Sequence, residues 1–412
     1  MINYLTNMKR IVFSVVLLLA ASVSFAQVSK VKEAKSLAEE SKPDFEKAQS
    51  LINEALQNPE TANDPNTWNV AGFIQKKINE KENEKLYLKQ DFDTAAYYNS
   101  VYHMFEYYLK CDELAQKPNE KGKVKNKFRK SNASTMLAER INLAAGGGDF
   151  FNKGQYEDAF RLLAMYADVT KAPMLENAQL ATTDTLLPMY AYYAALAAYQ
   201  IKNYKAVPQY TAYVDGNAEF GKDALQLCAD AYKIAGDTEN WLAIIKQGIQ
   251  KYPEHIYFIV SMVDHFTSQN KLSEAEKVAE EFVNQKPNDP QALYIQGYIY
   301  TLTKNYAGAQ TSLKKAIDLD GKNANYYCWL GHSYFYEAQD IIKSCESMDI
   351  NSPEYKGKQD QIKSLYKDAM PYYEKAKDLS PNDKALWQNL YTIYYALNMG
   401  AELESIEKAL GV

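Results

Sequence analysis

The sequence predicts an all-α protein in which antiparallel helix pairs stack into a superhelical solenoid. Three observations support this prediction. Apolar residues return at a fixed step of 34 residues, helix-breaking residues close the units at the same step, and no stretch of convincing length alternates apolar and polar residues as a half-buried strand would. A helix pair of this length cannot bury both of its apolar faces alone, so each unit needs to pack against its neighbours.

The first helix of each unit is marked by a small residue, which lets the second helix approach it closely. The small residues are Ala195, Ala229, Val263, Gly297 and Gly331. Three places later stand mostly larger residues: Ala198, Tyr232, Phe266, Tyr300 and Tyr334. The units close at Pro253, Pro287 and Gly321. Because the step holds without a single-residue slip, we predict one copied unit rather than several unrelated domains.

The second helix of a unit is clearest in residues 305–321, "NYAGAQTSLKKAIDLDG", whose apolar residues recur at helical spacing. Its stripe consists of Tyr306, Ala309, Leu313, Ala316 and Leu319, and it returns 60 residues later. The excess over 34 predicts about 26 inserted residues. The first helix continues through Ile342, and Ser352-Pro353-Glu354 is a typical helix start, with proline in the first position. We therefore expect a helical-hairpin insertion at 339–364.

The N-terminal residues are typical of a secretory signal peptide. Lys9 and Arg10 precede an apolar run over residues 11–21, and Ser24-Phe25-Ala26 forms a small-x-small cleavage site. We expect a signal peptide at 1–26, a periplasmic or secreted protein that begins at Gln27, and no membrane insertion after signal removal. An uncleaved N-terminal anchor is the alternative.

The rest of the chain divides by the quality of its repeats. Residues 27–187 contain degenerate helical copies, such as "KPDFEKAQSLINEAL", and residues 188–412 contain the regular ones. After removal of the signal peptide, 44 Lys and Arg face 52 Asp and Glu, a net charge of −8. This acidic balance argues against a nucleic-acid partner, which needs a concentrated positive field. Four scattered cysteines do not form a disulfide framework; a Cys328–Cys345 bridge is conceivable, but separate buried thiols are favoured.

The stretch "PQALYIQGYIYTLTKNYAGAQTSLKKAIDLDG" resembles the tetratricopeptide repeat family in its Gly, Tyr, Tyr, Ala, Leu, Ala spacing. The resemblance extends from about Pro188 to Pro381 and is fainter before it, and its export signal suggests an exported bacterial type. It departs from the family where Trp241 replaces a small residue and where Phe282 stands in the column of Ala316. The resemblance implies first helices that line a concave groove, and a scaffold or adaptor that binds another protein or peptide there.

No motif in the sequence indicates catalysis, and we expect neither an enzyme nor a cofactor. There is no Gly-x-Ser-x-Gly, His-Glu-x-x-His or phosphate-binding loop. The triple glycine at 146–148 suits close helix packing better than anion binding. Cys328 and His332 lie one helical turn apart and would suit two zinc ligands, but the sequence shows no second pair, and we predict no metal site.

The candidate binding residues occupy the first-helix columns that face away from the packing within a unit. They are Tyr192, Asp230, Tyr257, Asp264, Tyr294, Tyr298 and His332. Tyrosine suits reversible recognition because it combines a broad ring with a polar tip. Helix-interface packing is the alternative role for many of these tyrosines.

The chemistry of these columns predicts the kind of partner. Family members that hold a chaperone's C-terminal carboxylate use Lys, Arg and Asn in these columns, whereas here the residues are Tyr, Asp and Gln. We therefore expect a neutral to mildly basic protein or peptide. A module that binds glycans or cell-wall fragments, and a non-catalytic subunit of an envelope enzyme complex, are the alternatives. The convex face and the 339–364 hairpin are alternative binding surfaces.

Overall fold

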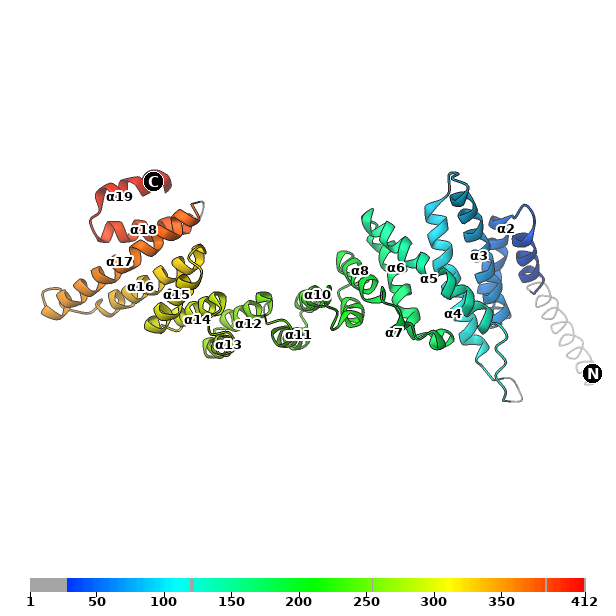
Figure 1. Cartoon of the computed structure of the whole chain (residues 1–412), viewed down its shortest axis with the longest axis horizontal. Helices are drawn as coiled ribbons and strands as arrows, with labels where there is room; N and C mark the ends of the chain where they lie inside the picture. Colours follow the sequence, from blue (N-terminus) through cyan, green and yellow to red (C-terminus); the bar gives the residue numbers. More distant parts are fainter. Residues whose placement is uncertain (1–27, 119–121, 254, 382–383, 411–412) are drawn as a thin grey trace, which may run out of the picture. The chain divides into compact units, whose positions relative to one another are not determined.

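The computed structural model describes residues 28–118, 122–253, 255–381 and 384–410, and the signal peptide predicted at 1–26 lies outside these residues. The described residues form helices and turns and contain no strand, which confirms the all-α prediction (Figure 1). None of their helices is long and apolar enough to span a bilayer. The chain separates into two compact units, and the boundary between Trp241 and Leu242 falls inside one helix. The 27–187 and 188–412 division rests on repeat quality instead and stays a prediction.

Unit 1 consists of short and long helices joined by tight turns. Its elements are a helix at 28–39, α2 (Phe45–Gln57), α3 (Pro65–Tyr87), α4 (Thr94–Ala115), α5 (Arg129–Asn152), α6 (Tyr156–Asp168), η1 (Val169–Lys171), η2 (Pro173–Ala178), α7 (Leu180–Thr183), α8 (Leu187–Gln200), α9 (Val207–Thr211), η3 (Ala212–Val214), α10 (Gly221–Ala235) and the start of α11 (Thr238–Lys251). One buried cluster joins α4 to α10, and another joins the helix at 28–39 to α2 and α3. Each helix therefore packs against its sequence neighbours, as in a repeat array.

The triple glycine of α5 lies where this helix meets two others. A Cβ on Gly146 would come within 2.5 Å of the Tyr98 ring, and a Cβ on Gly147 within 2.4 Å of Leu163, whereas Gly148 has open space. Two of the three glycines thus permit close helix packing, the role that the sequence favours for them.

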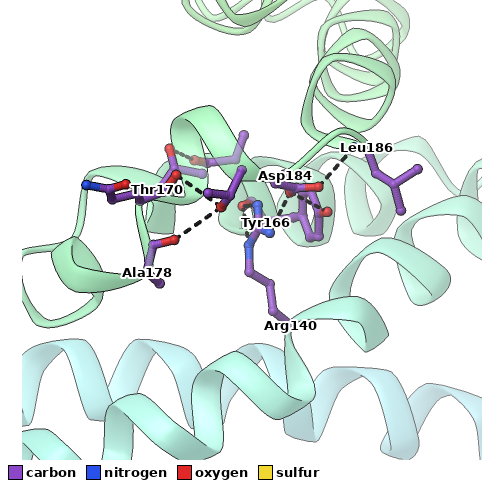
Figure 2. Close-up of polar contacts among 9 residues, drawn as sticks. Arg140, Tyr166, Thr170, Ala178, Asp184 and Leu186 are labelled. Atoms are coloured by element: carbon purple, nitrogen blue, oxygen red, sulfur yellow. Dashed lines mark hydrogen bonds and ion pairs between the residues drawn. The ribbon is translucent and has the colours of Figure 1, made fainter.

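A buried ion pair fixes the irregular segment between α6 and α8 to the helices beneath it (Figure 2). The Arg140 guanidinium donates to Asp184 at 2.6 Å and to the Tyr166 carbonyl at 3.2 and 2.9 Å, and it lies 3.6 Å from the centre of the Tyr166 ring. The Tyr166 hydroxyl also donates to Asp184, at 2.6 Å. Burial alone would raise the pKa of Asp184, but hydrogen bonds from Tyr166 and Arg140 hold that pKa below its usual range.

Unit 2 repeats one motif, a helix pair with a three-residue turn. Its elements are the remainder of α11, α12 (Ile256–Ser268), α13 (Leu272–Gln285), α14 (Pro290–Leu302), α15 (Tyr306–Leu319), α16 (Ala324–Ser344), α17 (Pro353–Leu379), α18 (Lys384–Ala396) and α19 (Gly400–Leu410). Each helix from α12 to α19 contacts the next one along the chain, so pairs α12/α13, α14/α15, α16/α17 and α18/α19 are stacked in sequence order.

The turn inside each pair contains a residue in the left-handed backbone region. Lys202, Gly236, Asn270 and Lys304 have φ between 56° and 73° and follow one another at exact 34-residue steps. Such a residue reverses the chain after a helix at little cost for glycine and at higher cost for lysine. The repeat predicted from side-chain pattern is therefore also a repeat of backbone conformation.

A second constant of the repeat is the contact between a glycine of the first helix and a large side chain of the second. A Cβ on Gly297 would lie 2.4 Å from Leu313, 16 residues later, and the Gly147–Leu163 contact of unit 1 has the same separation. Gly331 meets Tyr373 instead, 42 residues later. The difference of 26 residues equals the insertion expected at 339–364. The residues involved are the end of α16, which continues to Ser344, and the start of α17, which Ser352 caps at 3.1 Å.

The four cysteines are unpaired with one another in the structure. Cys328 lies in α16, and Cys345 is the residue that caps its C-terminus. Seventeen residues of α-helix separate them by about 25 Å, whereas a disulfide needs Cα atoms about 6 Å apart. The bridge that the sequence left open is therefore incompatible with this helix.

We expect Gly297→Ala to destabilise unit 2 by about 1 to 3 kcal/mol, because the added methyl group would overlap Leu313. The matched control is Gly357→Ala in α17, where a Cβ meets nothing within 4 Å. That change is expected to stabilise the helix by about 0.5 to 1 kcal/mol. Urea unfolding followed by circular dichroism measures both. Equal effects at the two positions would contradict the close contact of α14 and α15.

We expect Asp184→Ala to cost about 3 to 5 kcal/mol at neutral pH, because it leaves Arg140 buried without its partner. The folded-state pKa of Asp184 is lowered, so its contribution is full above the unfolded-state value near about 4 and is lost as pH falls through the folded-state pKa. The difference between wild type and variant is therefore expected to shrink in acid. Glu113→Ala, which breaks an exposed pair with Lys110, is the control and is expected to cost less than about 1 kcal/mol. A pH-independent difference for Asp184→Ala would contradict this account.

Candidate functional site

The first helices of unit 2 carry almost no charge. Helix α12, helix α14 and residues 324–336 of α16 contain no Lys or Arg, and Asp264 is their one acidic residue. The second helices α13 and α15 carry both Lys and acidic residues. Charge is therefore concentrated on the second helices, and the first helices offer mainly aromatic and apolar side chains.

Three of the predicted binding residues come together between α12 and α14. Asp264 of α12 is exposed, and its carboxylate acts on the phenols of both Tyr294 and Tyr298 in α14. Burial raises the pKa of Tyr294 to about 12, and nearby Cys328 raises it further. Burial and then the Asp264 charge raise the pKa of Tyr298. Both phenols are therefore neutral hydrogen-bonding groups at physiological pH.

Aromatic contacts continue from α14 along α16. The Tyr298 and Trp329 rings meet edge to face with centroids 4.4 Å apart, and Trp329 meets His332 in the same way at 5.0 Å. His332 is stacked on Tyr336, with centroids 5.2 Å apart and planes inclined by 7°. Tyr336 is 37% exposed, which is high for a ring with an aromatic neighbour. We call the set Asp264, Tyr294, Tyr298, Trp329, His332 and Tyr336 the aromatic surface.

His332 is held in place through both ring nitrogens. Its Nδ1 lies 2.5 Å from the hydroxyl of Tyr373, and its Nε2 lies 3.4 Å from the Cys328 sulfur. Tyr373 is fully buried, and burial raises its pKa well above the ordinary value. The imidazole therefore links the aromatic surface to the core of the α16/α17 pair. Although Cys328 and His332 are adjacent, the described residues contain no group of three or more His, Cys, Asp or Glu side chains that could hold a metal ion.

The other three predicted residues lie apart from this set. Tyr257 is at the start of α12, where its ring contacts those of His255 and Phe258. Tyr192 and Asp230 belong to unit 1. The Tyr192 ring is stacked on Phe220 at 5.4 Å, and Asp230 of α10 acts on the phenol of Tyr199 in α8, whose pKa burial and then this charge raise. The structure thus brings together four of the seven residues, Asp264, Tyr294, Tyr298 and, through Trp329, His332.

The sequence columns did not identify Trp329 and Tyr336 as binding residues. Tyr336 follows His332 by four residues, so the i, i+4 rule for helix neighbours could have found it. Trp329 follows Cys328, which stands in a predicted column, but its contact with Tyr298 depends on how α14 and α16 are rotated. That rotation is a tertiary property with no signal in either helix alone.

The arrangement suits binding rather than covalent chemistry. It presents ring faces, phenol hydroxyls and one carboxylate from three successive first helices. Half-buried Tyr and Trp side chains lose little rotamer entropy on binding, which favours them as contact residues in protein interfaces.

Comparisons with known proteins agree with the helical architecture. A family described as "Anaphase-promoting complex, cyclosome, subunit 3" matches residues 268–347. No curated protein matches the chain. Similar solved structures include the C-terminal part of a TPR repeat-containing protein from Cytophaga hutchinsonii, with 15% identity over 64% of this chain and 93% of that chain and a TM-score of 0.41. They also include a TPR repeats protein from Bacteroides fragilis, with 18% identity over 62% and 98% and a TM-score of 0.33, and the MamA protein, with 17% identity over 46% and 89% and a TM-score of 0.32.

The matched residues 268–347 span the α13, α14 and α15 helices and the first, regular part of α16, where the left-handed turns and the glycine contact recur at 34-residue spacing. The resemblance seen in the sequence is therefore confirmed, and the chain is a tetratricopeptide repeat protein.

Proposed function

We propose that this protein is a non-catalytic scaffold or adaptor that binds another protein or peptide on the aromatic surface of unit 2. The observation that carries the proposal is the aromatic, nearly uncharged character of three successive first helices. A surface meant only for solvent would carry the Lys and Glu residues that cover α13 and α15. Aromatic side chains that stay partly exposed on adjacent repeats are typical of a recognition surface.

The charge of the aromatic surface favours a neutral to mildly basic partner. Asp264 is its one carboxylate, and it lies beside ring faces of Tyr298 and Tyr294. A Lys or Arg side chain of the partner would gain both an ion pair with the carboxylate and cation–π contact with the rings. An acidic peptide would meet no cation on these helices and would be repelled by Asp264.

A glycan or cell-wall fragment is the second candidate ligand. It is favoured by Tyr336, an exposed ring held nearly parallel to His332, because a sugar ring could stack on such a flat face. The two candidates differ in what they require. A glycan would depend on Tyr336 and tolerate loss of the Asp264 charge, whereas a basic peptide would depend on Asp264 and Tyr298.

We also propose that the protein is exported and acts in the periplasm or outside the cell. The proposal is supported by the charged, apolar and small-residue regions of residues 1–26, in that order.

The peptide proposal is tested by selecting a phage-displayed random peptide library on the full mature chain and measuring the selected peptides by fluorescence anisotropy. We expect peptides that are neutral or basic, and we expect Tyr298→Ala to weaken their binding by about thirtyfold, as for a central aromatic contact. The control is Tyr395→Ala, which removes a 69% exposed tyrosine from α18 and is expected to leave affinity unchanged.

The Asp264 charge has its own matched control. Asp264→Asn is expected to weaken basic peptides by about three- to tenfold at low salt and less at high salt. Asp318→Asn removes an exposed carboxylate of the second helix α15 and is expected to have no effect. Selection of acidic peptides, or full affinity in a folded Tyr298→Ala variant, would contradict the proposal. Binding on a glycan array that Tyr336→Ala abolishes would favour the second candidate.

Export is tested by the mass of the protein recovered from its native host. We expect a chain that begins at Gln27, because Ala26 ends the small-x-small site. N-terminal sequencing of the periplasmic and medium fractions measures this. A chain that retains Met1 in the membrane fraction would contradict the proposal.

A further inference from the structure

Unit 2 has a second apolar surface, separate from the aromatic surface, between helices α11, α12 and α13. It is a groove with a volume of about 520 Å³. Its floor is formed by Ile259 and Met262 of α12 and Phe282 of α13, each no more than 5% exposed. Half-buried Ile249 of α11 and Val278 of α13 line its sides. A volume of this size and an apolar lining are typical of binding sites.

The groove occurs where the repeat departs from its family pattern. Phe282 stands one 34-residue step before Ala316, which is completely buried in α15. A large ring in a column suited to a methyl group holds neighbouring helices apart. The regular pair α14/α15 has alanine in this column, so the groove is a particular feature of this repeat and not of the fold.

The shape of the groove fits an elongated occupant. Residues of α13 line it from Glu274 to Gln285, eleven residues apart, which corresponds to about 16 Å along the helix. About three turns of a second helix have the same length. An amphipathic helix places apolar side chains at i, i+3, i+4 and i+7, and these can fill such a groove along its length.

The rim selects between an occupant with charges of both signs and one with a single charged end. Lys246 of α11 lies on one side, and Glu274, Lys277 and Glu281 of α13 lie on the other. These four side chains are exposed and balance in charge. A lipid headgroup of one sign would meet as many like charges as opposite ones. The edges of an amphipathic helix carry residues of both signs and can match the α11 cation and the α13 carboxylates at the same time.

We propose that the groove between α11, α12 and α13 is a docking site for an amphipathic helix of a partner protein, with its acidic edge toward α11 and its basic edge toward α13. This surface is formed by one first helix and two second helices, whereas the aromatic surface is formed by first helices alone. The protein thus has two separate contact surfaces in unit 2, and each can be occupied without the other.

The test uses the full mature chain and a fluorescein-labelled 16-residue helical peptide with a leucine stripe, glutamates along one edge and lysines along the other. A peptide of the same composition with the leucines reordered is the control for non-specific apolar binding, and palmitate is the probe for a single-headed lipid. We expect the striped peptide to bind at least about tenfold more tightly than the reordered one. Equal binding of the two peptides, or displacement of the striped peptide by palmitate, would overturn the proposal.

Two variants place the peptide in the groove. Val278→Lys puts a charge on the lining and is expected to weaken binding by at least about tenfold, whereas Asn284→Lys adds the same charge to an exposed position of α13 outside the lining and is expected to have no effect. A Val278→Lys variant with normal circular dichroism and unchanged affinity would overturn the proposal.

A rim variant keeps the test independent of the lining. Lys246→Glu combined with Lys277→Glu changes two exposed side chains and makes the rim acidic. We expect it to bind a striped peptide with lysines on both edges more tightly, and one with glutamates on both edges more weakly, than the wild type does. No change in this preference would overturn the proposal. Tyr298→Ala is expected to leave probe binding unchanged, which separates this site from the aromatic surface.

Discussion

The fold depends on the close contact between the two helices of each pair, which is possible only where the first helix lacks a side chain. In α14 the place of a Cβ on Gly297 is already occupied by Leu313, and in α5 Leu163 occupies the same place at Gly147. Because the second helix fills this face of the first, the first helix has another face that takes no part in the pair. That remaining face is where Tyr298 and Trp329 meet. The packing rule of the repeat thus also decides where a ligand can bind.

The distribution of charge follows from the same division between first and second helices. In α13 and α15 the side not packed against the first helix meets water, and it carries Lys and acidic residues. The equivalent face of α12, α14 and the first part of α16 has one carboxylate and no cation. A first helix without charges gains little from solvent and more from contact with a partner, since partly buried rings are stabilised when the rest of their surface is covered.

Much of the fold could be predicted from the sequence because its determinants are local and periodic. The 34-residue step locates the turns at Asn270 and Lys304, and the proline at the start of α17 marks where that helix begins. The role of Gly297 followed from its column. The Arg140–Asp184 pair could not be predicted, because 44 residues separate its members and the segment around Asp184 has no helical periodicity to indicate which face is buried.

The candidate site was predictable in part for a related reason. Columns of the repeat locate Tyr294 and Tyr298 on one face of one helix, but they do not fix contacts between helices. Trp329 reaches Tyr298 because α14 and α16 are neighbours at a particular rotation, and Tyr373 reaches His332 across the inserted residues. Tyr192 and Asp230 share the columns of the aromatic surface but belong to the other compact unit. Equal position in a repeat therefore predicts an equivalent environment, and a shared site requires in addition that the repeats be neighbours.

The two surfaces of unit 2 have different origins within the repeat. The aromatic surface arises from regular repetition, because successive first helices present equivalent positions side by side. The groove beside α13 arises from an exception, since Phe282 occupies a column in which α15 has Ala316. Regular repetition produces an extended surface whose contacts can be shared by many sequences, whereas an exception produces one local shape that occurs once in the array. A scaffold needs both properties, because an extended surface provides contact area and a unique feature fixes the register in which a partner binds.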